Sequence, residues 1–309
     1  MERHVNETRI QIAVTPVEHV RSLGVAVKRD DLTHALYGGN KARKLAFLLD
    51  DAVSRGARRV VTTGAWGSHH ALATALFARR AGLDAKLLLW PQPRTPHVDE
   101  VLAASLRSGA EVVRVEGLGR VPWHVARGWR DGDVWIPPGG SSPLGSQGFV
   151  TAAAELAAQI ARGDAALPEE IVVATGTGGT AAGLAVGLAR AGLPTRVRGA
   201  IVVAPGAVSR WSTRALVARL AATPSEAWDA ERRLSLDEGQ LGGGYGVATE
   251  RGARAAATFA DATGVELDLT YTAKAFAMAL ERVQAGVKVL YWHTLSAPHP
   301  AGGPPTAPV

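Results

Sequence analysis

The stretch at residues 37–45 reads Tyr-Gly-Gly-Asn-Lys-Ala-Arg-Lys-Leu and predicts a tight turn followed by a helix. The glycine pair lets the backbone turn where a side chain would clash. We expect Asn40 to be the helix N-cap, because its side-chain oxygen can accept from an N–H one turn on. Lys41 then falls in the first helical turn, where the helix dipole favours the neutral amine. A neutral amine can attack a carbonyl to form a Schiff base, so Lys41 is a candidate nucleophile.

The composition is that of an ordinary globular chain. Its 309 residues suffice for one large or two modest domains, and 47% of them are hydrophobic against 20% charged. The net charge of +6 comes mostly from scattered arginines without a long basic run, so we expect no nucleic-acid partner and a mild attraction for small anions. The sequence has no cysteine, which excludes disulfides, cysteine-based zinc sites and thiol nucleophiles.

The hydropathy pattern predicts neither a signal peptide nor a membrane span. The N-terminal stretch is charged and has no apolar core, and no uncharged apolar run is long enough for a transmembrane helix. We therefore expect a cytoplasmic protein without a membrane partner.

From residue 58 onward, strands of the buried type alternate with helices, which is typical of an α/β protein with parallel sheets. The expected strands span residues 10–14, 25–29, 59–63, 85–90, 111–115, 134–136, 171–174, 197–203 and 287–292. The expected helices span residues 41–54, 71–81, 98–108, 121–129, 149–161, 181–190, 211–221, 253–262 and 274–284. A glycine- and serine-rich run at 137–145 predicts a long loop. The Pro/Gly-rich residues 297–309 predict a disordered tail.

The loop at residues 175–180 reads Thr-Gly-Thr-Gly-Gly-Thr and lies between a predicted strand and a predicted helix. Backbone N–H groups of such a loop, together with the helix N-terminus, form a cradle for a phosphate. The hydroxyls of Thr177 and Thr180 could add hydrogen bonds. The alternative is a plain glycine-rich turn without a ligand.

The same loop fits the glycine pattern of dinucleotide-binding sites, but its surroundings do not. That pattern requires an acidic residue about twenty positions on, for the ribose hydroxyls. No Asp or Glu occurs between Glu170 and Glu226, which disfavours NAD. An NADP site that uses Arg196 or Arg198 remains a weaker alternative. The Walker pattern is absent, so the cradle suits a lone phosphomonoester best.

A second loop, Gly-Ser-His-His at residues 67–70, also joins a predicted strand to a helix start. We expect an anion site there for a carboxylate, with Ser68 either presenting its hydroxyl, capping the helix, or both. His69 and His70 are adjacent and lack the i, i+4 spacing of a helical metal pair, so no metal is expected.

These motifs together resemble the fold-type II pyridoxal-phosphate enzymes, in the branch of 1-aminocyclopropane-1-carboxylate deaminase and D-cysteine desulfhydrase. The resemblance implies a tryptophan synthase β-like fold with two open, twisted parallel-sheet domains and helices on both faces. Residues 1–48 and 165–309 would form the large domain that binds pyridoxal 5'-phosphate, 49–164 a small inserted domain, and the protein a homodimer. The matching blocks occur in the family's order at residues 28–33, 38–45, 175–184, 244–246, 271–275 and 293–294.

The resemblance also implies a set of cofactor contacts. Lys41 would be the Schiff-base lysine and proton carrier, with Asn40 beside the cofactor. Tyr271 would lie at the pyridine ring and Thr294 at its nitrogen, where a hydroxyl gives the nitrogen little reason to stay protonated. The cofactor is then a weaker electron sink, which suits β-elimination. The cofactor phosphate would be held by Thr175, Gly176, Thr177, Gly178, Gly179 and Thr180.

The substrate would be bound by Ser68, His69, His70 and Tyr245, with Ser68 at its carboxylate and Tyr245 above it. The catalytic set implied by the resemblance is therefore Lys41, Ser68, Tyr271 and Tyr245, with Lys41 and the tyrosines shared between cofactor and substrate chemistry.

Three departures from the family pattern stand in this sequence. His69 replaces the Asn that reaches the cofactor ring hydroxyl. Thr272 replaces the Glu that follows the ring tyrosine in the deaminase, which favours the desulfhydrase reaction. Ala273 and residues 295–296 replace family glycines.

We expect a pyridoxal-phosphate lyase or deaminase of small, D-configured amino acids that yields 2-oxo acid and ammonia by β-elimination. Alternatives within enzymes are a 1-aminocyclopropane-1-carboxylate deaminase, an amino-acid racemase and a β-replacement enzyme. An alternative of another class is a pyridoxal-phosphate-binding protein with lost or altered catalysis.

Overall fold

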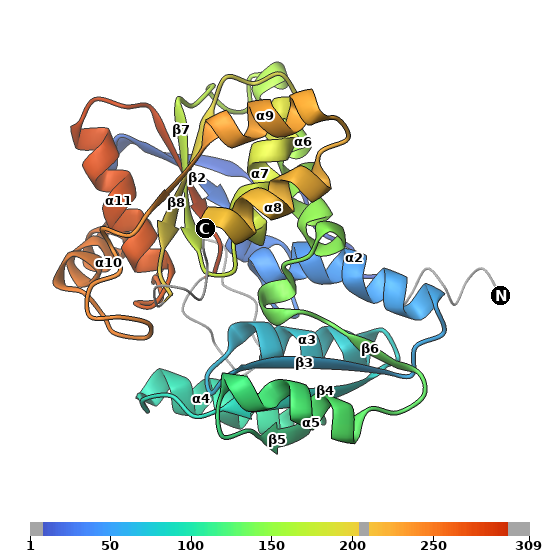
Figure 1. Cartoon of the computed structure of the whole chain (residues 1–309). Coiled ribbons are helices and arrows are strands. Elements are labelled where there is room, and N and C mark those ends of the chain that lie inside the picture. The colour runs from blue at the N-terminus through green and yellow to red at the C-terminus, as the bar shows by residue number, and fades with distance from the viewer. Residues whose placement is uncertain (1–8, 204–209, 296–309) are drawn as a thin grey trace.

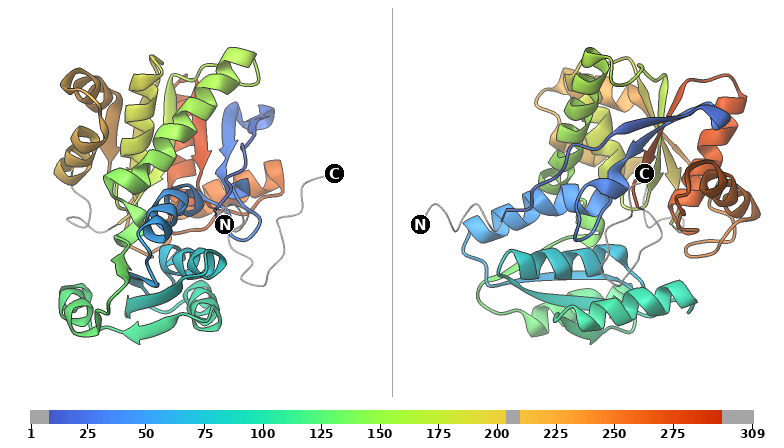
Figure 2. Two further views of the ribbon diagram at one scale, coloured as in Figure 1. Left: turned by 90° about the vertical axis from the view of Figure 1, so that its right-hand side faces the viewer. Right: turned by 180° about the vertical axis from the view of Figure 1, so that it is seen from behind.

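The computed structural model describes residues 9–203 and 210–295, whose strands form two sheets in separate lobes (Figures 1 and 2). The six-stranded sheet has the order β1 (Val17–Val20), β2 (Val25–Arg29), β10 (Val289–His293), β7 (Glu170–Thr175), β8 (Arg196–Ile201) and β9 (Leu234–Asp237). The four-stranded sheet has the order β5 (Glu111–Arg114), β4 (Asp84–Trp90), β3 (Arg59–Ala65) and β6 (Asp133–Trp135). All neighbouring strands are parallel except the antiparallel pair β1–β2.

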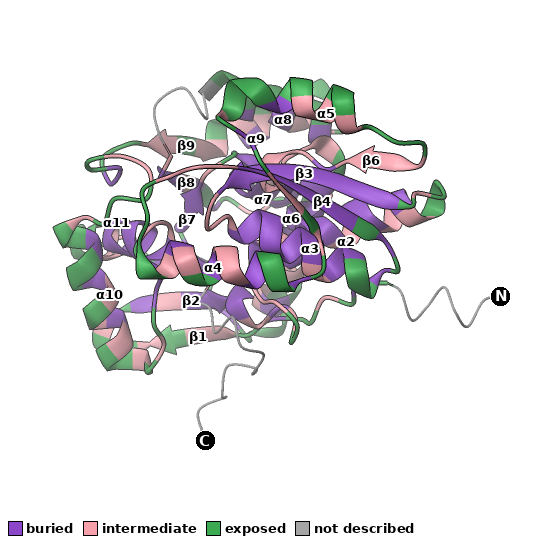
Figure 3. Ribbon diagram, turned by 90° about the horizontal axis from the view of Figure 1, so that it is seen from below, coloured by how far each residue is buried: buried purple, intermediate pink, exposed green. Residues whose placement is uncertain are grey.

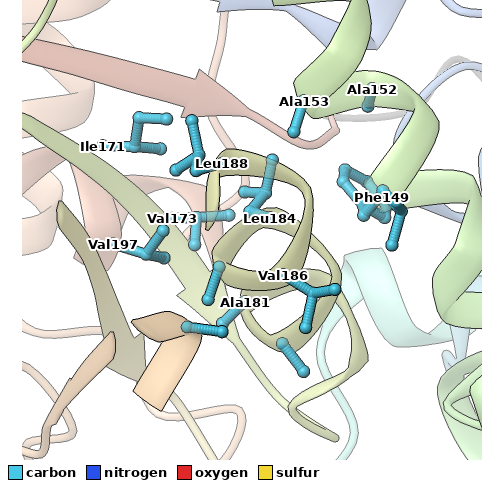
Figure 4. Close-up of a cluster of buried hydrophobic side chains, with 14 of the residues drawn as sticks. Phe149, Ala152, Ala153, Ile171, Val173, Ala181, Leu184, Val186, Leu188 and Val197 are labelled. Carbon is cyan, nitrogen blue, oxygen red and sulfur yellow. The ribbon is translucent and has the colours of Figure 1, made fainter. Parts of the chain in front are cut away.

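Helices cover both faces of the larger sheet because its strands are apolar on both sides. Ile171 and Val173 of β7 face α6 and α7, in the cluster that Figure 4 shows around α7. Val172 and Ala174 face the opposite side, against α10 and α11. These helices and two beside them have the bounds α6 (Pro143–Arg162), α7 (Gly179–Arg190), α8 (Arg210–Leu220), α9 (Pro224–Arg233), α10 (Glu250–Thr263) and α11 (Thr272–Gln284).

The smaller sheet is covered in the same way, and its central strand β3 is buried along its whole length (Figure 3). Val60 belongs to the core formed with α2 and α3, whereas Val61 packs toward α5. Helix α2 contacts both α3 and α6, and so joins the two lobes. The helices of this part are α2 (Asn40–Ser54), α3 (His69–Arg80), α4 (Pro96–Arg107) and α5 (Val121–Gly128).

The expected α/β alternation is confirmed, with three corrections. Residues 10–14 form no strand: Ile10 packs into the core beside α2, and β1 begins only after Pro16. Helix α6 begins at Pro143, inside the expected loop, because Ser142 caps it by accepting from the N–H of Gly145. Helix α9 and strand β9 were not expected.

Two expectations on organisation stay untested. The tail at 297–309 lies outside the described residues. The small domain at 49–164 stays a prediction; within that range, α6 packs on α7 of the larger sheet. No helix of the described chain combines the length and the apolar character that crossing a membrane requires.

Candidate active site

A cavity of about 410 Å³ lies where loops at the carboxyl ends of strands from both sheets meet. This edge of a parallel sheet is the usual place for a binding site in α/β proteins. The structure places every residue predicted for the site on the cavity wall except Gly179, which lies just behind it. The wall residues that were predicted are Asn40, Lys41, Ser68, His69, His70, Thr175, Gly176, Thr177, Gly178, Thr180, Tyr245, Tyr271 and Thr294.

Lys41 stands at the start of α2, and its neighbour Asn40 has a different role from the one expected. Gly39 is the N-cap, with a φ of 105°, and Asn40 is the first helical residue without a side-chain capping bond. The Asn40 side chain instead accepts from Lys41 Nζ at 2.6 Å and donates to Thr180 Oγ1 at 3.2 Å. Asn40 therefore ties the amine to the phosphate loop.

Burial lowers the pKa of Lys41 to about 8, and the negative charge of Asp268 opposes that shift only in part. A substantial fraction of the amine is therefore neutral near pH 8. This is the protonation state required of a lysine that attacks a carbonyl carbon.

The turn before Lys41 is hydrogen-bonded to the residue that follows strand β10. The Asn40 backbone N–H donates to the carbonyl of Thr294 at 2.8 Å. A Cβ at Gly39 would lie 2.3 Å from that same oxygen, so only glycine fits there. Lys41 and Thr294, which lie at opposite ends of the chain, are thereby fixed on one wall of the cavity.

The glycine loop before α7 has the geometry of a phosphate cradle, the role that the sequence predicts for it. Gly178 is the N-cap of α7 in a left-handed conformation, with φ 81°. A Cβ at Gly179 would lie 2.5 Å from Ser141 Oγ and 3.0 Å from Lys44 Nζ. The first N–H groups of α7 thus meet hydroxyls and the amine of Lys44, which a bound anion would hold in its charged form, in one place.

Lys44 is the main functional residue that sequence reasoning missed. Its Nζ donates to the carbonyl of Gly139 and to Ser141 Oγ, each at 3.2 Å, and among the described residues no carboxylate pairs with it. Burial, and then the charge of Lys41, hold the pKa of Lys44 well below its usual range. Its position three residues after Lys41 was the available signal, because i and i+3 share a helix face.

This region fits the phosphate of pyridoxal phosphate. Ser146 Oγ is fully buried and has no hydrogen-bond partner in the described structure, and a Cβ at Gly179 would lie 2.8 Å from it. Buried hydroxyls without a partner in the protein are uncommon and point to a bound ligand group. A phosphate at the α7 N-terminus would satisfy this hydroxyl and balance the charge of Lys44.

Two tyrosines line the same cavity. The hydroxyls of Tyr245 and Tyr271 lie 2.6 Å apart, and burial raises the pKa of both, so they remain protonated. Tyr271 is fixed by Asp268, whose carboxylate accepts from the Tyr271 N–H at 2.7 Å. Lys274, also missed, is buried and donates from Nζ to the carbonyls of Leu241 (2.8 Å) and Gly244 (3.3 Å), so it holds the loop that carries Tyr245.

The second predicted anion site lies at the start of α3. Ser68 caps this helix by accepting from the N–H of Ala71 at 3.3 Å, as expected. His70 hydrogen-bonds through Nε2 to Thr62 Oγ1 at 3.0 Å, and burial together with the charges of Lys41 and Lys44 lowers its pKa to about 3. His70 is therefore neutral beside the N-terminus of α3, and the N–H groups at this helix start can bind a carboxylate.

Comparison with known proteins agrees with this geometry. The family described as "Pyridoxal-phosphate dependent enzyme" matches residues 8–294. A Pyrococcus horikoshii protein, named provisionally as a 1-aminocyclopropane-1-carboxylate deaminase, is 34% identical over 91% of this chain and 88% of its own length. The D-cysteine desulfhydrase of Yersinia pestis strain Pestoides F is 33% identical, with 92% of each chain covered. The crystal structure of an ACC deaminase homologue superposes with a TM-score of 0.77 at 30% identity, covering 97% of this chain and 94% of the other.

The chain therefore belongs to the family of pyridoxal-phosphate-dependent enzymes, with the fold-type II architecture, and its cofactor is pyridoxal 5'-phosphate. The expectations of fold class, family, cofactor and enzymatic nature are confirmed. In the described part of the chain, no group of three or more histidine, aspartate and glutamate side chains is arranged to hold a metal ion.

Proposed function

We propose that the protein is a lyase or deaminase of small D-amino acids that releases a 2-oxo acid and ammonia by β-elimination. The observation that carries this proposal is the pairing of Lys41, with its lowered pKa, and the anion cradle around Lys44 across one cavity. The cofactor, when bound, supplies an electron sink that stabilises negative charge at the substrate Cα. The relatives named D-cysteine desulfhydrase support the same reaction.

The residues of this chain divide the work as follows. Lys41 would hold the cofactor and take the proton from the substrate Cα, because its pKa is lowered to about 8 and, unlike Lys44, its amine is not held by Gly139 and Ser141 in the anion cradle. Ser68 and the N-terminus of α3 would bind the substrate carboxylate. The protonated hydroxyls of Tyr245 and Tyr271 would orient the substrate side chain and donate a proton to the leaving group.

Thr272, the residue after Tyr271, favours β-elimination over the opening of a cyclopropane ring. Thr272 is buried and donates from Oγ1 to the Asp268 carboxylate at 2.6 Å, so it faces the helix start and is not part of the cavity wall. No carboxylate of the described residues lines the cavity. The 1-aminocyclopropane-1-carboxylate deaminase reaction is the second candidate, supported by the names of similar proteins.

The function is tested by reconstitution and product assay. The purified protein with pyridoxal phosphate should show an absorbance band of the lysine-bound cofactor, lost in Lys41→Ala and kept in the control Lys288→Ala, whose lysine is exposed. The holoprotein is then mixed with D-cysteine, β-chloro-D-alanine and the cyclopropane amino acid, and 2-oxo acid is measured. Product from the D-amino acids supports elimination, and product from the cyclopropane substrate alone supports the second candidate.

A binding protein with lost catalysis remains the alternative of another class, favoured by His69 at the position of the family Asn. It would show the band of bound cofactor but give no 2-oxo acid from any of the three substrates. Amino-acid racemisation or β-replacement would show as loss of optical activity, or as a new amino acid in the presence of an added thiol. Absence of the band would contradict all of these functions.

We also propose a homodimer in the cytoplasm, with a large domain of residues 1–48 and 165–309 and a small domain of 49–164. The support is the family resemblance. Light scattering of the purified protein and cell fractionation test the first two proposals. Limited proteolysis near residues 48 and 164 tests the domain boundaries.

A further inference from the structure

A second cavity, of about 670 Å³, adjoins the proposed active site. It lies between the start of α4 and α10, and it is larger than the cavity of about 410 Å³ that would have to hold both the cofactor and the amino acid. Three side chains, those of His69, Tyr245 and Tyr271, line both cavities and therefore stand at their boundary. A thiol or a chloride is too small a leaving group to fill this second space.

The residues at the boundary are those that the proposed function places at the leaving group. The hydroxyls of Tyr245 and Tyr271 lie 2.6 Å apart and would donate the proton that the leaving group takes up. The second cavity therefore begins where the leaving group of a small substrate ends.

His69 completes the boundary without offering it a free polar atom. Its Nδ1 lies 2.5 Å from the Tyr37 hydroxyl, and its Nε2 lies 2.9 Å from Nε2 of His97. Because both ring nitrogens are hydrogen-bonded, the His69 ring presents mainly its carbon atoms to a group that passes from one cavity to the other.

The walls of the second cavity are mostly apolar. Pro96 and Val98 of α4 line one side, and Leu267 and Leu269 line the other. Small side chains on α10 leave the space between them open, and these are Ala256, Ala257 and Ala260.

The charges of the second cavity disfavour an anionic ligand. Among the described residues that line it there is no lysine and no arginine. Glu266 is exposed to water, and the Asp268 carboxylate already accepts from the N–H groups of residues 270–272. A negatively charged group would lose hydration there without gaining a partner, whereas an uncharged apolar group gains by leaving water.

We propose that the second cavity binds a substituent on the leaving group, so that the substrates include D-cysteines whose sulfur carries an uncharged apolar group such as benzyl. This proposal rests on the proposed β-elimination. Lys41 takes the Cα proton, and the Cβ–S bond breaks with its electron pair on sulfur. The sulfur keeps its substituent, takes up one proton and leaves as a thiol. One water hydrolyses the remaining enamine to 2-oxo acid and ammonia, so no oxidant or reductant is required.

The first test compares substrates of the holoprotein, with 2-oxo acid as the measured product. S-benzyl-D-cysteine should have a kcat/KM about tenfold or more above that of D-cysteine, since even one methylene in an apolar pocket changes this ratio roughly 10- to 200-fold. S-(2-carboxyethyl)-D-cysteine, which carries a negative charge, should be a poorer substrate than either. Turnover of D-cysteine without turnover of the benzyl substrate would overturn this proposal and leave the proposed function intact.

The second test fills the second cavity from α10. Ala260→Leu adds volume to its wall at a position that does not line the active-site cavity. It should lower kcat/KM for S-benzyl-D-cysteine about tenfold or more and leave that for D-cysteine within about twofold. The control is Ala253→Leu, the same change at an exposed position of α10 that lines neither cavity, and it should alter neither value. Equal losses for both substrates in Ala260→Leu would overturn the proposal.

The third test measures binding without elimination. In D-2-amino-5-phenylpentanoate a carbon replaces the sulfur, so the molecule has no leaving group. Calorimetry with the holoprotein should show binding that D-alanine competes with and that Ala260→Leu weakens about tenfold. This result together with no 2-oxo acid from any substrate would refute the proposed elimination and leave the pocket in place. Binding that D-alanine does not displace, or that Ala260→Leu leaves unchanged, would overturn the pocket itself.

Discussion

The protonation of single side chains decides the chemistry of this cavity, and Lys41 gives the most direct prediction. Because its pKa is about 8, each pH unit below that value lowers the neutral fraction about tenfold. The rate of cofactor capture by the apoprotein should therefore rise with pH up to about 8 and then level off. Stopped-flow absorbance from pH 6 to 10 measures this rate. A rate that still rises above pH 9.5 would indicate an ordinary lysine.

Lys44 should act on the cofactor phosphate alone. Lys44→Met removes a buried cation beside Ser141 and the α7 N-terminus, and a hydrogen bond to a charged group contributes about 1.5–3 kcal/mol. We expect the affinity for pyridoxal phosphate to fall roughly 10- to 150-fold, with the affinity for pyridoxal, which lacks the phosphate, unchanged. Fluorescence titration with both ligands measures the difference. An equal loss for both ligands would place Lys44 elsewhere in the function.

Local chemistry explains which residues the sequence could reveal. Lys41, Ser68 and the loop at 175–180 were predicted because glycine turns and helix starts are local patterns. Lys44 and Tyr37 could not be assigned in this way, since their partners, Ser141 and His69, come from other segments. The N-cap role of Asn40 was wrong because the helix begins one residue earlier, with Gly39 as the N-cap, and the Asn40 side-chain oxygen accepts from Lys41 Nζ instead of a backbone N–H.

At the scale of elements, Lys274 ties the loop between β9 and α10 to α11. Lys274→Met on α11 removes the two hydrogen bonds to the carbonyls of Leu241 and Gly244, and leaves those carbonyls without that donor. We expect Tyr245 to lose its fixed position beside Tyr271, so that KM for the amino acid rises severalfold while cofactor affinity stays within about twofold. Steady-state kinetics and a spectroscopic titration of the tyrosines measure both effects.

The control for this change is Lys288→Met, which alters an exposed lysine next to β10. It should leave KM and the tyrosine titration as in the wild type. Loss of cofactor affinity in Lys274→Met with an unchanged KM would contradict the role of Lys274 in holding the Tyr245 loop.

Most elements followed from sequence periodicity, and the exceptions have physical causes. Residues 10–14 alternate like a strand, but Ile10 is used to fill the core beside α2, which no local pattern records. Helix α9 is polar and buries only Ala230 fully, so it lacks an apolar stripe that would predict it.

At the scale of the whole molecule, a buried ionic network joins segments that are distant in sequence. Glu155 on α6 accepts from Lys28 Nζ at 2.5 Å and from Arg43 Nη1 at 2.9 Å, and Asp30 also pairs with Arg43. Both cations are buried. Glu155→Gln leaves an excess of positive charge there, and breaking such a network costs about 3–5 kcal/mol.

We therefore expect Glu155→Gln to lower the free energy of unfolding by about 3–5 kcal/mol at pH 7, as measured by urea denaturation. Burial works to raise the pKa of Glu155, but the hydrogen bonds and charges of Arg43 and Lys28 outweigh it and leave the pKa lowered. The difference in unfolding free energy between the wild type and Glu155→Gln should be complete at a pH above the ordinary pKa of glutamate. It should disappear as the pH falls through the lowered pKa that Glu155 has in the folded protein.

The matched control is Glu250→Gln, which breaks an exposed pair with Arg254 one helical turn away. Exposed pairs of this kind contribute about 0–1 kcal/mol, so this variant should unfold almost as the wild type does. Equal losses in the two variants would contradict the role assigned to the buried network.

The position of β10 also sets the order in which the protein can become active during synthesis. Among the strands of the described residues this one comes last in sequence, yet it lies between β2 and β7, and Thr294 just beyond it accepts the hydrogen bond from Asn40. A nascent chain that has emerged only as far as α11 has both partner strands unpaired on that side, and its nucleophilic lysine has no fixed place. The buried site that lowers the pKa of Lys41 is thus completed only after residues 289–294 have left the ribosome and joined the sheet.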